Sequence, residues 1–159
     1  MGKDEGSTGS DADHNGADVK FAQMMIPHHQ QAVEMSGLVL KADGVEPDVV
    51  ALAEDIKAAQ APEIELMQGW LEDWGADDGG MDGMDGMLSV DQMTALEGAR
   101  GDRLVALFLE GMIGHHEGAI QMARDALDAG SSPDAQELAG QIIESQRAEI
   151  ARMRDILGP

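Results

Sequence analysis

Apolar side chains recur at spacings of three and four residues along most of the chain, which is the pattern of amphipathic helices. No stretch of useful length alternates between apolar and polar positions as a half-buried strand does. The chain is therefore predicted to be all-α. Four long helices and one short one are expected, within residues 18–44, 47–75, 89–97, 102–130 and 133–158.

Several of the expected helix starts carry residues that favour such positions. Ser89 and Gln92 have the spacing of a capping box, in which each side chain bonds the backbone N–H of the other residue. Asp102 is expected to cap the helix that follows. Ser132 followed by Pro133 is a good pair for an N-cap and a first helical residue. These signals support separate helices with short connections.

The two halves of the chain repeat each other. Residues 21–35 (FAQMMIPHHQQAVEM) and 108–122 (FLEGMIGHHEGAIQM) share the frame F-x3-M-I-x-H-H-x2-A-(V/I)-x-M. Downstream of each copy, the motif Q-x2-E-I-x2-M occurs at residues 60–67 and again at 146–153. Each half is therefore predicted to form a helical hairpin. The whole is predicted to be a pseudo-twofold four-helix bundle with a ferritin-like crossover.

The repeat also suggests how the chain is divided. Residues 1–17 contain almost nothing apolar and are predicted to be a disordered acidic tail. Residues 18–158 are predicted to form a single bundle domain. Within it, repeat one covers 18–75, the crossover with its short helix covers 76–101, and repeat two covers 102–158.

The charge of the chain limits its partners. Ten Lys and Arg stand against 31 Asp and Glu, which gives a formal net charge of −21. Such a chain repels nucleic acid and anionic membrane surfaces, so neither is expected as a partner. No apolar run is long enough to span a bilayer, and insertion into a membrane is not expected either. Metal ions are the favoured ligands.

The composition of the apolar residues is unusual. The chain has no cysteine, which excludes disulfides, zinc fingers, iron–sulfur clusters and thiol catalysis. It has 12 methionines, whereas aromatic residues are only 3% of the chain. No nucleophilic triad, phosphate-binding loop or cofactor motif occurs, which favours a binding protein over an enzyme. The chain therefore offers many soft sulfur atoms to a cation.

The repeated motif places its histidines and methionines on one side of each helix. At about 100° per residue these positions fall within about 120°, the width of one buried stripe. Adjacent histidines diverge by about 100°, so packing alone does not explain two copies of such a pair. If the two helices face each other, the stripes converge near the middle of the bundle. The candidate metal ligands are Met25, His28, His29, Met35, Met112, His115, His116 and Met122.

These residue types favour a soft metal. A ferritin-type di-iron site requires Glu-x-x-His, but the residues three before His28 and His115 are Met25 and Met112. Thioether and imidazole together suit Cu(I), or Ag(I) as a mimic, better than iron, magnesium or calcium. Methionine sites without cysteine also suit an oxidising compartment. Copper is therefore the expected cofactor.

The partner helices carry further candidates on their inward stripes, and several roles are open for them. Glu63 and Glu149 could accept a hydrogen bond from a histidine N–H and fix its tautomer, or they could serve packing alone. Direct ligation is a third possibility. Met67 and Met153 could add sulfur ligands or could belong to the core.

The acidic stretch between the halves contains a second group of methionines. Met81, Met84 and Met87 are spaced three residues apart and alternate with Gly and Asp. They could form a secondary site for a soft cation. They could equally belong to a flexible linker whose methionines touch the bundle.

The twin M-I-x-H-H-x2-A-(V/I)-x-M motif, with Q-x2-E-I-x2-M downstream, resembles the family catalogued as domain of unknown function 305. The resemblance covers residues 18–158, and it implies a ferritin-like bundle that is secreted, periplasmic or lipid-anchored. It also implies copper or silver binding, as reported for some members. The Gly-Asp-Met loop and the acidic tail depart from the family pattern. By position the resemblance points to Met25, His28, His29, Met35, Met112, His115, His116 and Met122.

Three functions follow as hypotheses. The first is a copper-binding protein outside the cytoplasm that takes Cu(I), Cu(II) or Ag(I) and acts in buffering, sequestration or delivery. The second is a ferritin-like di-metal oxidase or hydrolase that uses Glu63 and Glu149 with the histidine pairs. The third is a metal-free helical interaction module. The sequence makes no prediction of oligomeric state.

Overall fold

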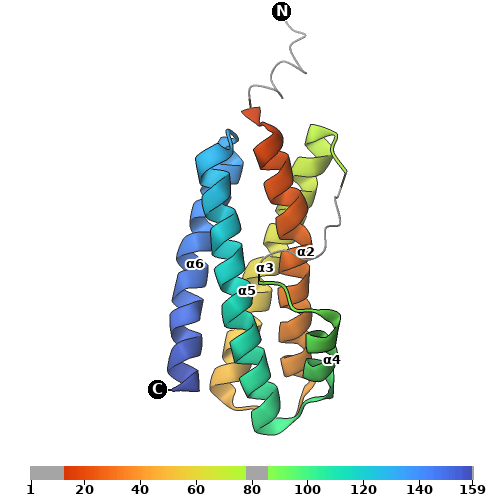
Figure 1. The fold of residues 1–159 in the computed structure, drawn as a ribbon, viewed down its shortest axis with the longest axis vertical. Helices are drawn as coiled ribbons and strands as arrows, with labels where there is room; N and C mark the ends of the chain where they lie inside the picture. The colour runs from red at the N-terminus through yellow and green to blue at the C-terminus, as the bar shows by residue number, and fades with distance from the viewer. Residues whose placement is uncertain (1–12, 78–85, 159) are drawn as a thin grey trace, which may run out of the picture.

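The structure is a computed structural model that describes residues 13–77 and 86–158. In these residues the chain forms α2 (Gly16–Lys41), α3 (Pro47–Trp74), α4 (Val90–Gly98), α5 (Gly101–Ala129) and α6 (Pro133–Leu157), with no strand. Four long helices lie side by side, and the short α4 lies on the outside of the bundle (Figure 1). The prediction of an all-α four-helix bundle with a short crossover helix is confirmed.

The order of packing follows the repeat. α2 packs along α3 and α5 packs along α6, so each repeat forms one helical hairpin. The two hairpins join through α2 and α5, whereas α3 and α6 make much less contact with each other. α4 touches α2 and α5. The helices that carry the repeated histidine motif are therefore the two that hold the hairpins together.

Two helix starts match their predicted caps and one does not. The Ser89 hydroxyl accepts from Gln92 N at 3.1 Å at the start of α4, and the Ser132 hydroxyl accepts from Ala135 N at 3.1 Å at the start of α6. The prediction that Asp102 caps α5 is wrong. Arg100 is the N-cap there, without a side-chain bond, and Asp102 lies inside the first turn. A carboxylate at that position still favours the positive end of the helix dipole.

α2 begins earlier than predicted. Its N-cap is Asn15, whose side chain accepts from Asp18 N, while the Asp18 carboxylate accepts from Asn15 N at 2.8 Å. This reciprocal capping extends the helix to Gly16, inside the segment predicted to be a disordered tail. Residues 1–12 of that predicted tail lie outside the described residues.

Asp18 also ties the start of α2 to the loop between α5 and α6. Its side chain is fully buried, and Oδ2 accepts from the backbone N–H groups of Ser131 and Ser132, each at 2.9 Å. Asn15 donates from its side-chain amide to the Ala129 carbonyl at 2.9 Å. Gly130 leaves room for this carboxylate, since a Cβ at that position would overlap with Asp18 Oδ1. The two repeats are thus joined by polar contacts at this end of the bundle.

The apolar core consists of two clusters. The Trp70 cluster contains Phe21, Met25, Met67, Trp70 and Met122, among others. The Phe108 cluster contains Met35, Leu52, Phe108, Met112 and Met153, among others. On α2 the histidine pair falls between the residues of one cluster and those of the other, and the same holds on α5 for every buried residue except Ile120. Within the described residues, no helix is long and apolar enough to cross a membrane.

Candidate metal centre

The four motif histidines lie in the interior of the bundle. His28 and His29 are on α2, His115 and His116 are on α5, and none is more than 1% exposed. Consecutive residues of a helix point about 100° apart, so each pair sends its two rings to different neighbours. The first ring of each pair faces the opposite motif helix, and the second faces the partner helix of its own hairpin.

The first ring of each pair meets its counterpart across the seam between α2 and α5. The ring centroids of His28 and His115 are 3.7 Å apart, with 37° between the ring planes. Two imidazolium cations at this separation and in this burial would repel each other strongly. The contact therefore favours neutral rings, and neutral imidazole is the form that binds metals.

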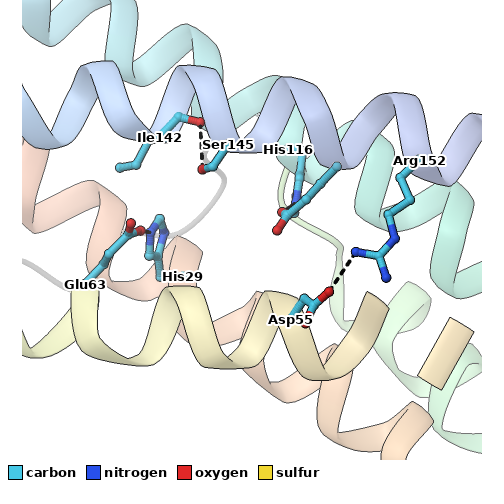
Figure 2. A network of polar contacts seen from close by, with 8 residues as sticks. His29, Asp55, Glu63, His116, Ile142, Ser145 and Arg152 are labelled. Atoms are coloured by element: carbon cyan, nitrogen blue, oxygen red, sulfur yellow. Dashed lines mark hydrogen bonds and ion pairs between the residues drawn. The ribbon is translucent and has the colours of Figure 1, made fainter. Parts of the chain in front are cut away.

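The second ring of each pair meets a glutamate. His29 Nε2 lies 2.7 Å from Glu63 Oε1 on α3, and His116 Nε2 lies 2.6 Å from Glu149 Oε1 on α6. Figure 2 views the region in which these contacts lie, between α3 and α6. A ring that donates from Nε2 and stays neutral keeps its lone pair on Nδ1. This is one of the three arrangements that the sequence left open for the glutamates.

The environment of His115 keeps its ring neutral. Burial lowers its pKa well below the usual value of 6.5, and the neighbouring His28, His116 and His29 lower it further, against a smaller opposing contribution from the His28 backbone. Within the described residues, neither ring nitrogen makes a hydrogen bond of ordinary geometry. His115 is therefore neutral inside the bundle, and one of its ring nitrogens keeps a lone pair that a ligand could use.

Among the described residues, ring nitrogens in both histidine pairs are buried without a hydrogen-bond partner. In the described part of the chain, the Nδ1 atoms of His29 and His116 are buried and make no hydrogen bond. A buried polar atom without a partner is costly, and such atoms require an explanation. A metal ion bound by these nitrogens would satisfy them in both copies of the motif.

Buried methionines lie in both core clusters, before and after the histidines along α2 and α5. The Trp70 cluster holds Met25, Met67 and Met122, and the Phe108 cluster holds the repeat-related Met112, Met153 and Met35. All are buried, and the most exposed is Met122 at 8%. Each cluster thus receives one motif methionine from α2, one from α5 and one methionine from a partner helix.

The predicted residues form pairs rather than one cluster. No group of three or more His, Asp or Glu that could hold a metal occurs in residues 13–77 and 86–158. The carboxylates Glu63 and Glu149 instead bond separate histidines. A preformed di-iron type of centre requires several carboxylates and histidines around one point, which the described residues do not provide.

The crossover methionines are only partly described. Met81 and Met84 lie outside the described residues, whereas Met87 is partly buried against the Trp70 cluster. Next to it, the Gln31 side chain bonds both backbone groups of Leu88. Sequence reasoning did not find Gln31, because a single glutamine on a helix carries no signal for a loop that packs on it.

The comparisons with known proteins identify the same family that the repeated motif resembles. A profile of the family described as "Domain of unknown function (DUF305)" matches residues 18–157. The chain belongs to the DUF305 family. It shares 32% identity with a DUF305 fragment from Deinococcus radiodurans, with a TM-score of 0.84 over 91% of this chain and 97% of that one.

Other similar solved structures include a second DUF305 protein and several structures of CopM. A DUF305 protein from Streptomyces coelicolor that is proposed to be secreted is 35% identical, with a TM-score of 0.83 over 89% of this chain and 91% of that one. CopM in its Cu(I)-bound form is 32% identical, with a TM-score of 0.73 over 86% of this chain and 91% of that one. Structures of CopM with Cu(II) and with Ag are also similar to this chain. Curated protein sequences give no match.

Proposed function

We propose that this protein binds copper, as Cu(I) or Cu(II), and also Ag(I), in the middle of its bundle. The observation that carries the proposal is the buried His28–His115 contact, in which neither nitrogen of His115 makes a hydrogen bond of ordinary geometry within the described residues. The existence of CopM structures with Cu(I), Cu(II) and Ag supports the same class of metals.

The residues that would hold the metal fit its chemistry. Buried imidazole nitrogens and thioether sulfur are ligands that Cu(I) and Ag(I) prefer, and imidazole also suits Cu(II). The donors would be the four histidines together with the four motif methionines. Met67 and Met153 are two further buried methionines that belong to the same clusters. When bound, copper would be held by nitrogen and sulfur ligands between the two apolar clusters, where solvent does not reach it.

In this proposal Glu63 and Glu149 orient the histidines rather than bind the metal. Each carboxylate takes up the Nε2 side of its histidine, at 2.7 Å for His29 and 2.6 Å for His116. A carboxylate on one ring nitrogen fixes the tautomer and raises the basicity of the other nitrogen. The Nδ1 atoms would then face the metal.

The proposed role is buffering, sequestration or delivery of the metal outside the cytoplasm. Methionine and histidine do not form disulfides, so a site without cysteine is not lost to disulfide formation in an oxidising compartment. A relative that is proposed to be secreted supports this location. Met81, Met84 and Met87 in the acidic crossover would form a secondary collecting site for the same cations.

The test is Cu(I) affinity, measured without oxygen in competition with a chelator whose Cu(I) complex is coloured. The test variant replaces the four motif histidines with asparagine, which stays polar but has no imidazole nitrogen to offer a metal. We expect the affinity to fall at least about a hundredfold in this variant. His14→Asn is the matched control, since His14 lies on Trp74 and outside the motif.

Each result bears on the proposal. Circular dichroism shows whether the variant keeps its helices, and metal-to-protein ratios after gel filtration give the stoichiometry. Equal affinity of the folded variant and the wild type would contradict the proposal. Failure of the wild type to bind Cu(I), Cu(II) or Ag(I) would favour a metal-free interaction module. Bound iron or manganese with oxidase turnover would favour a di-metal enzyme instead.

A further inference from the structure

The segment that ends the crossover crosses the seam between the two motif helices. We call residues 86–88 the strap. In Figure 1 the coloured trace resumes in front of the seam between α2 and α5, about halfway along the bundle, and runs from there to α4. The strap therefore lies near the middle of the bundle, and its contacts with each helix decide what it covers.

The strap lies directly on the backbone of α5. Gly86 has φ +81°, and a Cβ built on it would overlap with the carbonyl oxygen of Gly114 and lie 3.2 Å from Gly118 Cα. Leu88 sits against Gly111, where a Cβ would be 3.3 Å from Leu88 Cδ2. Glycine at Gly86 and Gly111 permits this close approach. The strap thus spans the α5 turn that carries His115.

On the side of α2, one glutamine holds the strap. Gln31 Oε1 accepts from Leu88 N at 2.8 Å, and Gln31 Nε2 donates to the Leu88 carbonyl at 3.0 Å. Both hydrogen bonds are partly buried, and they satisfy both backbone groups of one loop residue. We call these two Gln31–Leu88 hydrogen bonds the clamp. Gln31 follows His28 by about one helical turn, so the clamp lies beside the His28–His115 contact.

The two outer faces of the candidate site therefore differ. The α2–α5 face is covered by the strap, and Met87 packs inward against the Trp70 cluster that includes Met25 and Met122. The α3–α6 face is lined by Glu63 and Glu149, whose side chains are 19% and 14% exposed. A cation that reaches the histidines passes through one of these faces.

We propose that the strap is the gate of the site and that Gln31 is the positioning residue that keeps it closed. The proposal rests on the proposed binding of soft cations between the histidines. When the Gln31 bonds break, the strap lifts from Gly114 and uncovers the α2–α5 seam, and Met87 leaves the Trp70 cluster with it. A thioether is then present at the opening through which the cation passes. The strength of the clamp sets the rates of uptake and release.

The experiment compares Gln31→Leu with Gln30→Leu. Leucine keeps the size of glutamine but removes both bonds to Leu88, while Gln30 is an exposed neighbour on the same helix turn. Amide hydrogen exchange of Leu88, measured by NMR on the metal-free protein, reports whether the strap is seated. Stopped-flow transfer of Cu(I) to an excess of coloured chelator reports the rate of release.

We expect Gln31→Leu to speed both Leu88 exchange and Cu(I) release by about tenfold, since two hydrogen bonds that hold the closed form are lost. The equilibrium affinity should change by less than about threefold, because uptake speeds up by a similar factor. Gln30→Leu should match the wild type in both rates. Gly86→Ala, which places a Cβ against Gly114 at a positive φ, should act in the same direction as Gln31→Leu.

Three results would overturn the gate, and they are distinguishable from each other. If Leu88 exchange is unchanged in Gln31→Leu, the clamp does not hold the strap. If exchange rises but Cu(I) release does not, the cation uses the α3–α6 face, and the proposed copper site still stands. If the wild type binds no soft cation at all, the proposed function fails and the gate fails with it.

Discussion

At the scale of single residues, the chemistry of the candidate site follows from the direction of two adjacent side chains. His28 reaches across the seam to His115, while His29 turns toward Glu63 within its own hairpin. The same division occurs in the second copy, where His116 bonds Glu149. One buried histidine would pass for a core residue, but the two repeated pairs with their repeated carboxylates form a polar layer between the two apolar clusters.

The carboxylate partners give the first prediction at this scale. Glu63→Gln and Glu149→Gln keep the shape of the side chain but remove its charge, which weakens control over the histidine tautomer. We expect Cu(I) affinity to fall by about 10- to 100-fold in each variant. Competition with a coloured chelator measures the change, and the exposed Glu65→Gln is the matched control. Loss of affinity in the Glu65 variant, or none in the other two, would contradict the orienting role.

The lowered pKa of His115 gives a prediction about pH. In the folded protein this ring stays neutral below the pH at which the unfolded chain, with a pKa near 6.5, takes up a proton. The unfolded state then binds more protons, so stability should fall as the pH drops below about 6.5, by up to about 1.4 kcal/mol per pH unit. Above that pH the contribution of His115 is constant.

Urea unfolding of the metal-free protein between pH 8 and pH 5.5 measures this dependence. His115→Leu removes the group, and its stability should depend less steeply on pH than that of the wild type. The comparison concerns slopes, so a change in stability at pH 8 caused by the substitution itself does not affect it. Equal slopes for the two proteins would show that His115 takes up its proton in the folded state as easily as in the unfolded one.

The sequence predicts some of these residues and misses others for physical reasons. A repeat within one chain exposes residues that serve a shared purpose, so His28 and Glu63 stand out together with their second copies. Gln31 and Asp18 have no counterpart of the same type in the second half, and their partners are backbone atoms far along the chain. A contact with a distant backbone leaves no pattern in the sequence.

At the scale of the helices, local signals predict most of the ends. Ser89, Ser132 and Gly130 stop or start helices where capping preferences indicate. The start of α5 differs, since Gly101 takes a positive φ of 58° and the helix begins one residue before Asp102. Glycine makes that backbone turn possible, and a helix that is stabilised by packing of one buried face does not require a side-chain cap.

The buried carboxylate at the start of α2 gives the prediction at this scale. Asp18→Ala removes the acceptor of the backbone N–H groups of Ser131 and Ser132, of which the second is buried, and it also removes the Asp18 half of the capping box of α2. We expect the free energy of unfolding to fall by about 2–4 kcal/mol, measured by urea denaturation. The exposed Asp128→Ala is the control and should change stability by less than about 0.5 kcal/mol. A similar loss of stability in both variants would show that the hydrogen bonds of the buried Asp18 carboxylate have no special role.

At the scale of the whole molecule, the histidines form a polar layer between two apolar clusters. The pseudo-twofold arrangement exchanges Met25 with Met112 and Met35 with Met122 between the clusters. A site in this layer belongs to both hairpins at once, so a metal bound there would hold α2 to α5. The net charge of −21 raises the concentration of cations near the surface without fixing which cation binds.

This arrangement predicts that metal stabilises the whole bundle. Ag(I) at about a hundred times its dissociation constant should add about 2.7 kcal/mol to the free energy of unfolding. For a chain of this size the melting temperature should rise by about 5–10 °C. Thermal unfolding followed by circular dichroism measures the shift, and the variant with four asparagines should show none. A similar rise in both proteins would place the silver elsewhere, such as on the exposed acidic residues.

The most direct test of the account is X-ray absorption spectroscopy of the Cu(I)-loaded protein. The account predicts a copper centre bound by both imidazole nitrogen and methionine sulfur, with the imidazole signal lost when the four motif histidines become asparagine. A spectrum with oxygen ligands alone, or one that the four substitutions leave unchanged, would contradict the claim that the repeated histidine pairs and their methionines form the copper site.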